Sequence, residues 1–288
     1  MTLHFAVIGY PVEHSLSPAM HNAVFKKLKE DAVYEKVEVA PENLERFIQQ
    51  IRGGRFSGVN VTIPHKISVM EYLDEISPEA RLIGAVNTIK QDKGRLLGYN
   101  TDGIGCVEAF NAAGFNPKGK KIVVVGAGGA ARAVLFQLLL SGAEKIVLVN
   151  RTLHKAQAIT EEIEEKRKSL NATGTVEATE YRPDSLKAAI KNADALVNTT
   201  PVGMHPRISE TPFPAEYFKK GLTVMDVVYN PLKTRFLREA ESAGCSTIDG
   251  IGMFVMQGAA SQKIWLSRSP PVNVMRDAVM AALSKTAV

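Results

Sequence analysis

The sequence predicts an α/β fold divided into two domains, and three observations carry this prediction. Apolar segments typical of strands alternate with amphipathic, helical segments along the 288 residues. A glycine-rich turn at residues 126–131 joins a strand-like segment directly to a helical one. The character of the chain changes after residue 102 and again near 250. Repeated strand–helix alternation is typical of parallel sheets covered by helices.

The first half contains short strands punctuated by proline and glycine. Proline at the first helical position favours helices that begin at Ser17 and Ser77. Helical spacing predicts a further helix over 41–51. Strands are expected over 3–9, 32–39 and 57–63, the last stopped by Pro64. Residues 85–91 and 94–100 predict a hairpin around Asp92-Lys93-Gly94.

The second half repeats the strand–helix alternation with longer helices. A helix over 101–114 is expected to end at Gly114. Residues 120–152 predict a strand, the glycine-rich turn, a helix and a second strand. Further strands are expected over 194–200 and 222–230. Further helices are expected over 153–169, 183–191, 232–243, 250–264 and 273–284.

Composition disfavours several classes of protein. The net charge of +5 is scattered, and the dense run at 161–168 mixes acidic and basic residues as a solvated helix face does, so we expect no nucleic-acid partner. Cys106 and Cys245 predict no disulfide framework, and the histidines form no ligand set, so no metal is expected. The N-terminus does not resemble a signal peptide, and the apolar run at 133–140 is too short for a bilayer. We expect a cytoplasmic protein with no membrane contact, monomeric or homodimeric, in which Trp265 has a packing role.

The glycine-rich turn predicts a Rossmann-type, doubly wound domain that binds a dinucleotide. Residues 126–131 read Gly-Ala-Gly-Gly-Ala-Ala and follow an apolar strand, as the G-x-G-x-x-A fingerprint requires. Gly126 permits the tight turn, Gly128 leaves room for the pyrophosphate, and Ala131 lets helix and strand pack closely. The diphosphate then lies at the helix N-terminus, where free N–H groups favour an anion.

The end of the second strand favours NADP over NAD. NAD enzymes commonly place Asp or Glu there to bind the ribose 2′-hydroxyl. This strand ends instead in Asn150-Arg151-Thr152, with Lys155 one turn later. A guanidinium binds a phosphate through two hydrogen bonds and stacks on an adenine ring. Arg151 therefore predicts recognition of a 2′-phosphate.

Polar residues of the first domain gather where strands end and helices begin. Ser15 and Ser17 precede or open a helix, where hydroxyl and N–H groups suit a carboxylate. Asn60 and Thr62 share one face of a strand that leads to Lys66, and Asn87 and Asp102 follow further along the chain. A Lys–Asp pair at a hydride-transfer site delivers or accepts the hydroxyl proton. These residues predict a dehydrogenase for a small, polar, carboxylate-bearing ring substrate.

Eight motifs, in this order, resemble those of the shikimate dehydrogenase family. They cover the chain from residue 9 to about 260 and read SLSPAMHN, NVTIPHK, GAVNT, NTDG, GAGGAAR, NRT, NTTPVGM and DGIGMFVMQGA. The resemblance implies reversible reduction of 3-dehydroshikimate to shikimate by NADPH, a step of aromatic amino-acid and chorismate biosynthesis. It implies a substrate domain of residues 1–102 plus 252–288, an NADP-binding domain of residues 103–251, and a cleft between them.

The resemblance also implies roles for individual residues. The acid–base pair falls on Lys66 and Asp102. The substrate-binding positions fall on Ser15, Ser17, Asn60, Thr62, Asn87, Thr101, Tyr229 and Gln257. The cofactor positions fall on Gly126, Ala127, Gly128, Gly129, Ala130, Ala131, Asn150, Arg151, Thr152 and Lys155, with Thr200, Val227, Gly250 and Met253 near the nicotinamide.

Two alternatives remain open at this stage. The segments 153–171 and 205–214 look longer than in compact members and resemble the branch that also oxidises quinate, some of whose members use NAD. The retained Asn150-Arg151-Thr152 favours NADP and shikimate. The other alternative is a non-catalytic sensor of NADP or of a pathway acid. The presence of both Lys66 and Asp102 argues against it.

Overall fold

The computed structural model describes residues 2–167 and 172–286 of the chain. Contacts between Cα atoms divide it into unit 1, residues 1–102 with 255–288, and unit 2, residues 103–254. The second division falls inside one helix, α9 (Gly250–Leu266), which also contains residue 252, where the sequence placed the boundary. A domain boundary inside a continuous helix leaves no turn residue in the sequence to mark it.

Unit 1 contains a mixed sheet, to which the expected hairpin contributes an antiparallel pair of strands. Strands β1 and β2 are parallel, as are β1 and β3, whereas β3–β5 and β5–β6 are antiparallel. The expected hairpin causes the change of direction: Lys93 and Gly94 form its two-residue turn with φ of 50° and 86°. Among the described residues the sheet has six strands in the order β2-β1-β3-β5-β6-β4. Their bounds are β1 Leu3–Gly9, β2 Ala32–Glu38, β3 Gly58–Val61, β4 Glu75–Ile76, β5 Thr88–Asp92 and β6 Arg95–Tyr99.

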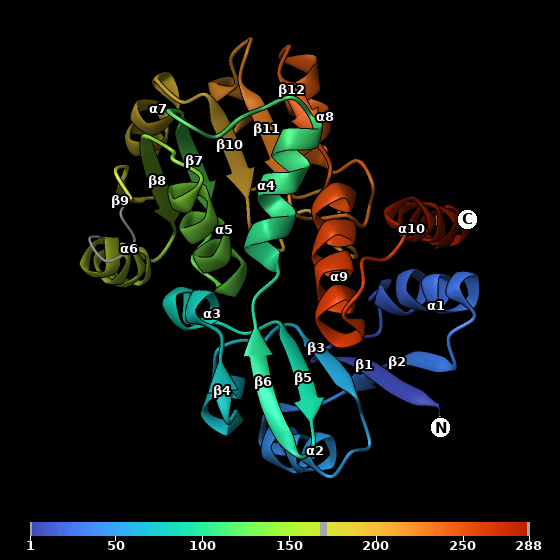
Figure 1. The fold of residues 1–288 in the computed structure, drawn as a ribbon. Helices are drawn as coiled ribbons and strands as arrows, with labels where there is room; N and C mark the ends of the chain where they lie inside the picture. The colour runs from blue at the N-terminus through green and yellow to red at the C-terminus, as the bar shows by residue number, and fades with distance from the viewer. Residues whose placement is uncertain (1, 168–171, 287–288) are drawn as a thin grey trace. The chain divides into compact units, whose positions relative to one another are not determined.

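The helices of unit 1 come from both ends of the chain. From the N-terminal part come α1 Ser17–Leu28, the 3₁₀ turn η1 Pro41–Asn43, α2 Leu44–Arg52, η2 Ser68–Tyr72 and α3 Pro78–Ile83. Most of α9 and all of α10 (Val272–Thr286) come from the C-terminal part, and α10 lies beside α1 (Figure 1). One core cluster joins α2 to the sheet through side chains such as Ile48 and Val59.

Trp265 attaches α9 to the sheet of unit 1. Its ring stacks on Phe5 of β1 with the ring centroids 4.9 Å apart. Its indole Nε1 donates a hydrogen bond of 2.9 Å to the carbonyl of Ile89. At Gly58 of β3 a Cβ atom would overlap the indole ring. Trp265 therefore packs α9 against β1, β3 and β5.

Unit 2 confirms the Rossmann-type, doubly wound fold. Its sheet is parallel, and among the described residues it has six strands in the order β12-β11-β10-β7-β8-β9. Winding begins at β7 and reverses between β7 and β10, which is the switch point where such sheets bind ligands. The strands are β7 Lys121–Val125, β8 Lys145–Asn150, β9 Thr175–Glu180, β10 Ala195–Asn198, β11 Thr223–Asp226 and β12 Ser246–Ile248.

The helices of unit 2 follow the expected ranges closely. They are α4 Asp102–Ala112, α5 Gly129–Leu140, α6 Leu153–Arg167, α7 Pro183–Lys191 and α8 Arg235–Ser242, with a 3₁₀ turn η4 at Ala215–Tyr217. In Figure 1, α4 and α5 lie in front of the strands. The expected extension of the helix at 153 to residue 169, and of the longer segment to 171, lies outside the described residues. Strands β9 and β12, the two edge strands of this sheet, were not predicted from the sequence.

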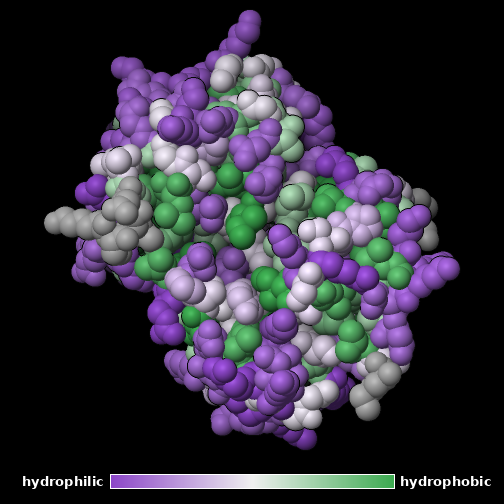
Figure 2. Space-filling view, in the orientation of Figure 1, coloured by the Kyte–Doolittle hydropathy of each residue, from purple (hydrophilic) through white to green (hydrophobic). Residues whose placement is uncertain are grey.

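The surface mixes polar and apolar side chains. Hydrophilic residues cover most of the face shown in Figure 2, with smaller hydrophobic areas between them. Ile63 and Ile67, which flank Lys66 in the chain, are 61% and 54% exposed. Within the described residues, no helix combines the length and the apolar character that crossing a membrane requires.

Candidate active site

The structure of unit 1 brings Lys66 and Asp102 together. The Lys66 Nζ lies 2.5 Å from Oδ2 of Asp102, and only 15% and 8% of the two side chains are exposed. The Lys66 carbonyl accepts a hydrogen bond of 2.8 Å from the amide of Val86, which holds the backbone of the lysine. Charges removed from bulk water interact more strongly than charges at the surface. The pair is therefore an ammonium and a carboxylate in firm contact, partly open to a ligand.

Hydrogen bonds hold both the side chain and the backbone of Asp102. It is the first residue of α4, and its Oδ1 accepts a hydrogen bond of 2.8 Å from Nδ2 of Asn87. Its backbone amide donates to Oδ1 of Asn100, and Nδ2 of Asn100 donates to the carbonyl of Ala85. Oδ1 of Asn87 also accepts a hydrogen bond of 2.8 Å from the amide of Thr101. The structure thus joins Asn87, Thr101 and Asp102, which the sequence analysis proposed separately.

The helix that begins with Ser17 leaves its N-terminus available. Ser17 is the first residue of α1, and Leu16 holds the N-cap position without a side-chain capping hydrogen bond. The Ser15 hydroxyl accepts from the amide of Ser17 at 3.3 Å and lies 3.2 Å from the Ser17 hydroxyl. Two adjacent hydroxyls at an uncapped helix start suit a carboxylate.

Asn60 lies on β3 as expected and is 6% exposed. Its Nδ2 lies 2.9 Å from Oγ of Ser261 and 3.1 Å from both the Asn87 carbonyl and the Thr88 hydroxyl. Its Oδ1 accepts from the Tyr34 hydroxyl at 2.8 Å. Thr62, just beyond the end of β3, is half-buried and retains its position near Lys66 in the chain.

The two remaining substrate-binding candidates lie in different units. Gln257 is a half-buried residue of α9 in unit 1, and its carbonyl accepts a hydrogen bond of 3.0 Å from the Ser261 hydroxyl. Tyr229 belongs to unit 2, where it follows β11 and stacks on Phe254 with ring centroids 4.2 Å apart.

The glycine-rich turn of unit 2 fits a diphosphate. Gly126 has φ of +111°, which L side chains rarely adopt, and a Cβ there would approach Thr199 and Thr200 to 2.8 Å. Gly128 is the N-cap of α5, and a Cβ added to it would meet nothing within 4 Å. No side chain caps α5, and its first turn contains no acidic residue. The free N–H groups and the open space at Gly128 form the cradle that a diphosphate requires.

A buried polar cluster supports this turn at the switch point of the sheet. Oδ1 of Asn198, the last residue of β10, accepts hydrogen bonds from the amide and hydroxyl of Thr200 at 2.9 and 2.7 Å. Its Nδ2 donates to Oδ1 of Asp226 at 2.8 Å. Burial raises the pKa of Asp226 to about 6, against the opposing effect of hydrogen bonds from Thr234, Val228 and Asn198. The sequence analysis missed Asn198 and Asp226; their positions at the ends of successive parallel strands were the available signal.

Thr200 and Val227, two of the residues expected near the nicotinamide, contact Asn198 of this cluster. The amide of Val227 donates to the carbonyl of Asn198 at 3.0 Å. A Cβ at Gly250 would approach the Val227 carbonyl to 2.7 Å, so this glycine allows α9 to begin against that loop. The structure therefore places Thr200, Val227 and Gly250 at one edge of the sheet. Met253, one turn along α9, is buried.

The end of β8 presents positive charge. Asn150 closes the strand, and its Nδ2 donates to the Thr152 carbonyl at 2.9 Å. Arg151 and Lys155 are exposed, and neither forms a side-chain hydrogen bond or ion pair with the residues that the structure describes. Glu180, opposite Asn150 on β9, is paired with Arg182 at 2.7 Å. Two unneutralised cations at this strand end fit the extra phosphate of NADP.

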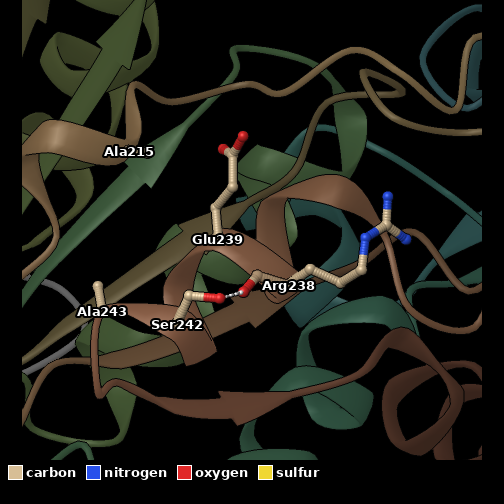
Figure 3. Close-up of a pocket in the computed structure, with 5 residues that line it drawn as sticks. All are labelled: Ala215, Arg238, Glu239, Ser242 and Ala243. Atoms are coloured by element: carbon tan, nitrogen blue, oxygen red, sulfur yellow. Dashed lines mark hydrogen bonds between the residues drawn. The ribbon is translucent and has the colours of Figure 1, made fainter.

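A hollow of about 370 Å³ elsewhere in unit 2 contains none of the predicted site residues. Its lining comes from α8 and η4 and consists of Ala215, Arg238, Glu239, Ser242 and Ala243 (Figure 3). The Ser242 hydroxyl is bound to the Arg238 carbonyl at 2.9 Å, within the helix. A shallow hollow of this kind adds nothing to the chemistry of the Lys66–Asp102 pair.

The doubly wound sheet, the diphosphate cradle and the Lys–carboxylate pair together define an oxidoreductase that uses a nicotinamide dinucleotide. Three family profiles match the chain: a shikimate dehydrogenase substrate binding domain at residues 7–89, a shikimate / quinate 5-dehydrogenase at 109–212, and a shikimate 5'-dehydrogenase C-terminal domain at 250–280. The chain belongs to the shikimate dehydrogenase family.

Known relatives are similar to this chain over almost its whole length. A shikimate dehydrogenase (NADP(+)) from Methanopyrus kandleri is 46% identical over 283 residues, which cover 96% of this chain and 94% of the relative. A crystal structure of a shikimate dehydrogenase in complex with NADP+ has a TM-score of 0.90 and 43% identity, covering 98% of this chain and 96% of that one. The shikimate 5-dehydrogenase of Thermus thermophilus, in complex with NADP(H) and shikimate, has a TM-score of 0.87 and 40% identity, covering 98% and 100%.

Proposed function

We propose that this protein catalyses the reversible reduction of 3-dehydroshikimate to shikimate with NADPH. The observation that carries this proposal is the 2.5 Å contact between Lys66 and Asp102 in a chain of the shikimate dehydrogenase family. An ammonium held by a carboxylate is the acid that a ketone needs as it becomes an alcohol.

Unit 1 supplies groups for each part of the substrate. The hydroxyls of Ser15 and Ser17, with the free N–H groups of α1, would bind the ring carboxylate. Hydroxyl and amide groups would bind the ring hydroxyls, and in this role we place Asn60, Thr62, Asn87, Thr101, Tyr229 and Gln257. Donors arranged in a largely buried site disfavour analogues that lack those hydroxyls, because the donors are then left unpaired.

Lys66 and Asp102 act as one proton-transfer pair. NADPH supplies the hydride when it is bound. As negative charge grows on the ketone oxygen, the Lys66 ammonium stabilises it, and a proton passes from the pair to that oxygen. Asp102 keeps Nζ in place through Oδ2 while Asn87 fixes Oδ1. In the reverse direction the same pair accepts the proton of the hydroxyl.

Unit 2 supplies the cofactor site. We assign the diphosphate to the turn from Gly126 to Ala131 and the nicotinamide side to Thr200, Val227, Gly250 and Met253. Arg151 and Lys155, next to Asn150 and Thr152, would bind the 2′-phosphate, since both are exposed cations without an ion-pair partner in the described part of the chain. This charge supports NADP rather than NAD.

Quinate is the second candidate substrate. The observation in its favour is that the profile matching residues 109–212 is described as shikimate / quinate 5-dehydrogenase. The test is absorbance at the reduced-nicotinamide band for each pairing of shikimate or quinate with NADP+ or NAD+. We expect shikimate with NADP+ to give the highest kcat/KM. Tight binding of shikimate and NADP+ without reduction in any pairing would reject the enzyme and support a sensor.

We also propose a cytoplasmic location. Cys106 and Cys245 are buried thiols, and buried thiols are usual in proteins of a reducing compartment. Cell fractionation of the source organism tests this, and sedimentation of the purified chain distinguishes a monomer from a homodimer. Accumulation in an oxidising compartment would contradict the proposal.

A further inference from the structure

The orientation of the Asn87 side chain is determined by neighbouring groups that can act only as hydrogen-bond donors or only as acceptors. The backbone amide of Thr101 is always a donor, and it points at Oδ1 of Asn87 from 2.8 Å. Nδ2 must therefore face the Asp102 carboxylate, to which it donates at 2.8 Å. A rotation of this amide by half a turn would place two donors against each other and an oxygen against the carboxylate. Whatever holds Asn87 in this orientation also holds Asp102.

Two hydroxyl groups that have no assigned role in binding or catalysis, those of Thr88 and Ser261, lie close to Asn87. The Thr88 hydroxyl on β5 donates to Oδ1 of Asn87 at 2.9 Å. The Ser261 hydroxyl on α9 lies 2.9 Å from the Thr88 hydroxyl and 3.3 Å from that of Thr101. Thr88 and Ser261 are both completely buried. Thr88 and Ser261 thus link β5, α9 and Thr101, the residue before Asp102.

Asn60 of β3 and Tyr34 of β2 extend this hydrogen-bond cluster. Nδ2 of Asn60 lies 3.1 Å from the Asn87 carbonyl, an unambiguous acceptor, so Nδ2 is the donor side. It also lies 2.9 Å from the Ser261 hydroxyl and 3.1 Å from that of Thr88. Oδ1 of Asn60 accepts from the Tyr34 hydroxyl at 2.8 Å. Both faces of the Asn60 amide are thus turned toward protein groups.

One assignment of hydrogens gives each hydroxyl hydrogen of the cluster an acceptor. The two Nδ2 hydrogens of Asn60 go to Ser261 and Thr88, and the Asn87 carbonyl accepts from the amide of Val61 at 2.8 Å. Ser261 donates to the Gln257 carbonyl at 3.0 Å and accepts from Asn60 and from the Thr101 hydroxyl. Thr101 accepts from Asn87, whose Nδ2 lies 3.0 Å from its hydroxyl. Thr88 donates to Asn87 and accepts from Asn60. A buried network in which each hydroxyl hydrogen has an acceptor is rigid, and loss of one member leaves several others unpaired.

We propose that Thr88 and Ser261 are positioning residues, which hold the Asn87 amide and through it the Asp102 carboxylate in the geometry for proton transfer. Asn60 supports this set through its contacts with the Asn87 carbonyl and the Ser261 hydroxyl. The proposal rests on the proposed function, since it concerns the step that Lys66 and Asp102 perform. A catalytic group displaced by about 1 Å loses up to roughly 100-fold in rate, so a network that prevents this has a measurable effect.

The test compares Thr88→Val with Thr88→Ser, which separate the hydroxyl from the methyl group. Valine keeps the shape of threonine and removes the hydroxyl, whereas serine keeps the hydroxyl. We expect Thr88→Val to lower kcat by about 10-fold and Thr88→Ser to stay near wild type, with KM for NADP+ unchanged in both. Because Thr88 contacts Asn87 and not the cofactor turn, the loss should appear in kcat rather than in KM for NADP+, and the serine variant should restore it.

Ser261→Ala provides a second, smaller change on a different element. It should show the same fall in kcat with an unchanged KM for NADP+, and it decides the question if Thr88→Val does not fold. A variant that is only less stable would melt earlier and keep the wild-type kcat below its melting temperature. Wild-type kcat in folded Ser261→Ala or Thr88→Val would overturn the inference. Failure of the wild-type protein to oxidise shikimate would instead overturn the proposed function, so the two failures are distinguishable.

Discussion

Asn87 donates a hydrogen bond of 2.8 Å to Oδ1 of Asp102, and this leaves Oδ2 to face the ammonium of Lys66 at 2.5 Å. The two oxygens of one carboxylate therefore have different partners. The carboxylate cannot rotate without breaking one of these contacts. Catalytic groups held in place before the substrate arrives need no rearrangement during the reaction.

Replacement of Lys66 by alanine should remove proton transfer and leave cofactor binding intact. We expect kcat for shikimate oxidation to fall by about 10²–10⁴-fold, the usual contribution of a general acid–base group. The dissociation constant of NADPH should not change, because the diphosphate cradle lies in unit 2. Steady-state rates and a fluorescence titration with NADPH measure the two quantities. Lys27→Ala removes an exposed lysine of unit 1 as the control; equal kcat in the two variants would contradict the assignment.

Replacement of Arg151 by alanine should reduce the preference for NADP. The guanidinium is exposed at the end of β8, where a 2′-phosphate would bind it through charge-assisted hydrogen bonds of roughly 1.5–3 kcal/mol. We expect about a 10-fold or greater loss in NADPH affinity and little change for NADH. Titration of both cofactors provides the measurement, with Arg238→Ala, another exposed arginine of unit 2, as the matched control. An equal loss for both cofactors would exclude phosphate recognition by this residue.

Asp226 should make unit 2 less stable as the pH rises. Burial raises its folded-state pKa from 3.8 to about 6, so between these values the folded protein binds more protons than the unfolded chain. The contribution of this group to the free energy of unfolding is therefore largest at low pH and is lost as the pH rises through about 6. Asp226→Asn should be free of this dependence.

The measurement is thermal unfolding of wild type and Asp226→Asn across this pH window. The difference in Tm between them should shift in favour of the variant as the pH rises. Asp184→Asn, which changes an exposed carboxyl of the same unit, controls for net charge. A constant difference between wild type and Asp226→Asn across the window would show that the carboxyl does not titrate there.

His21 should have the opposite effect in unit 1. Its ring stacks on Tyr34 with centroids 4.3 Å apart, and neither ring nitrogen has a hydrogen-bond partner among the described residues. Burial lowers the pKa of His21 from 6.5 to about 3. Between these pH values the imidazole is protonated in the unfolded chain and neutral in the folded protein. Stability from this group is complete above pH 6.5 and is lost as the pH falls toward about 3.

His21→Phe keeps an aromatic ring in the stack and removes both nitrogens. Because a buried polar group without a partner costs about 1–3 kcal/mol, the variant should be more stable than wild type, and more so at acid pH. Chemical unfolding at several pH values measures this, with His4→Gln, an exposed histidine of unit 1, as the control. Lower stability of His21→Phe throughout the range would mean that the phenyl ring does not fit, and a parallel pH dependence in both proteins would contradict the titration.

The sequence predicted the regular elements well because their signals are local. The strand, turn and helix around Gly126 follow from apolar runs and from glycine at a positive φ. The edge strands β9 and β12 were missed because an exposed or three-residue strand has a weak pattern and is stabilised by its neighbour in the sheet. The mixed sheet of unit 1 likewise depends on which strands pair, which periodicity does not encode.

The sequence by itself determined the fold class, the cofactor turn and the residue types of the candidate site, because short-range geometry and steric limits act within a few positions of the chain. Only the tertiary structure decided what those residues touch. Asn60 and Ser261 are 201 positions apart, yet they share a hydrogen bond of 2.9 Å. Hydrogen bonds fall off within a few tenths of an ångström, so a partner so distant in the chain is set by the packing of β3 against α9 and by nothing in either local sequence.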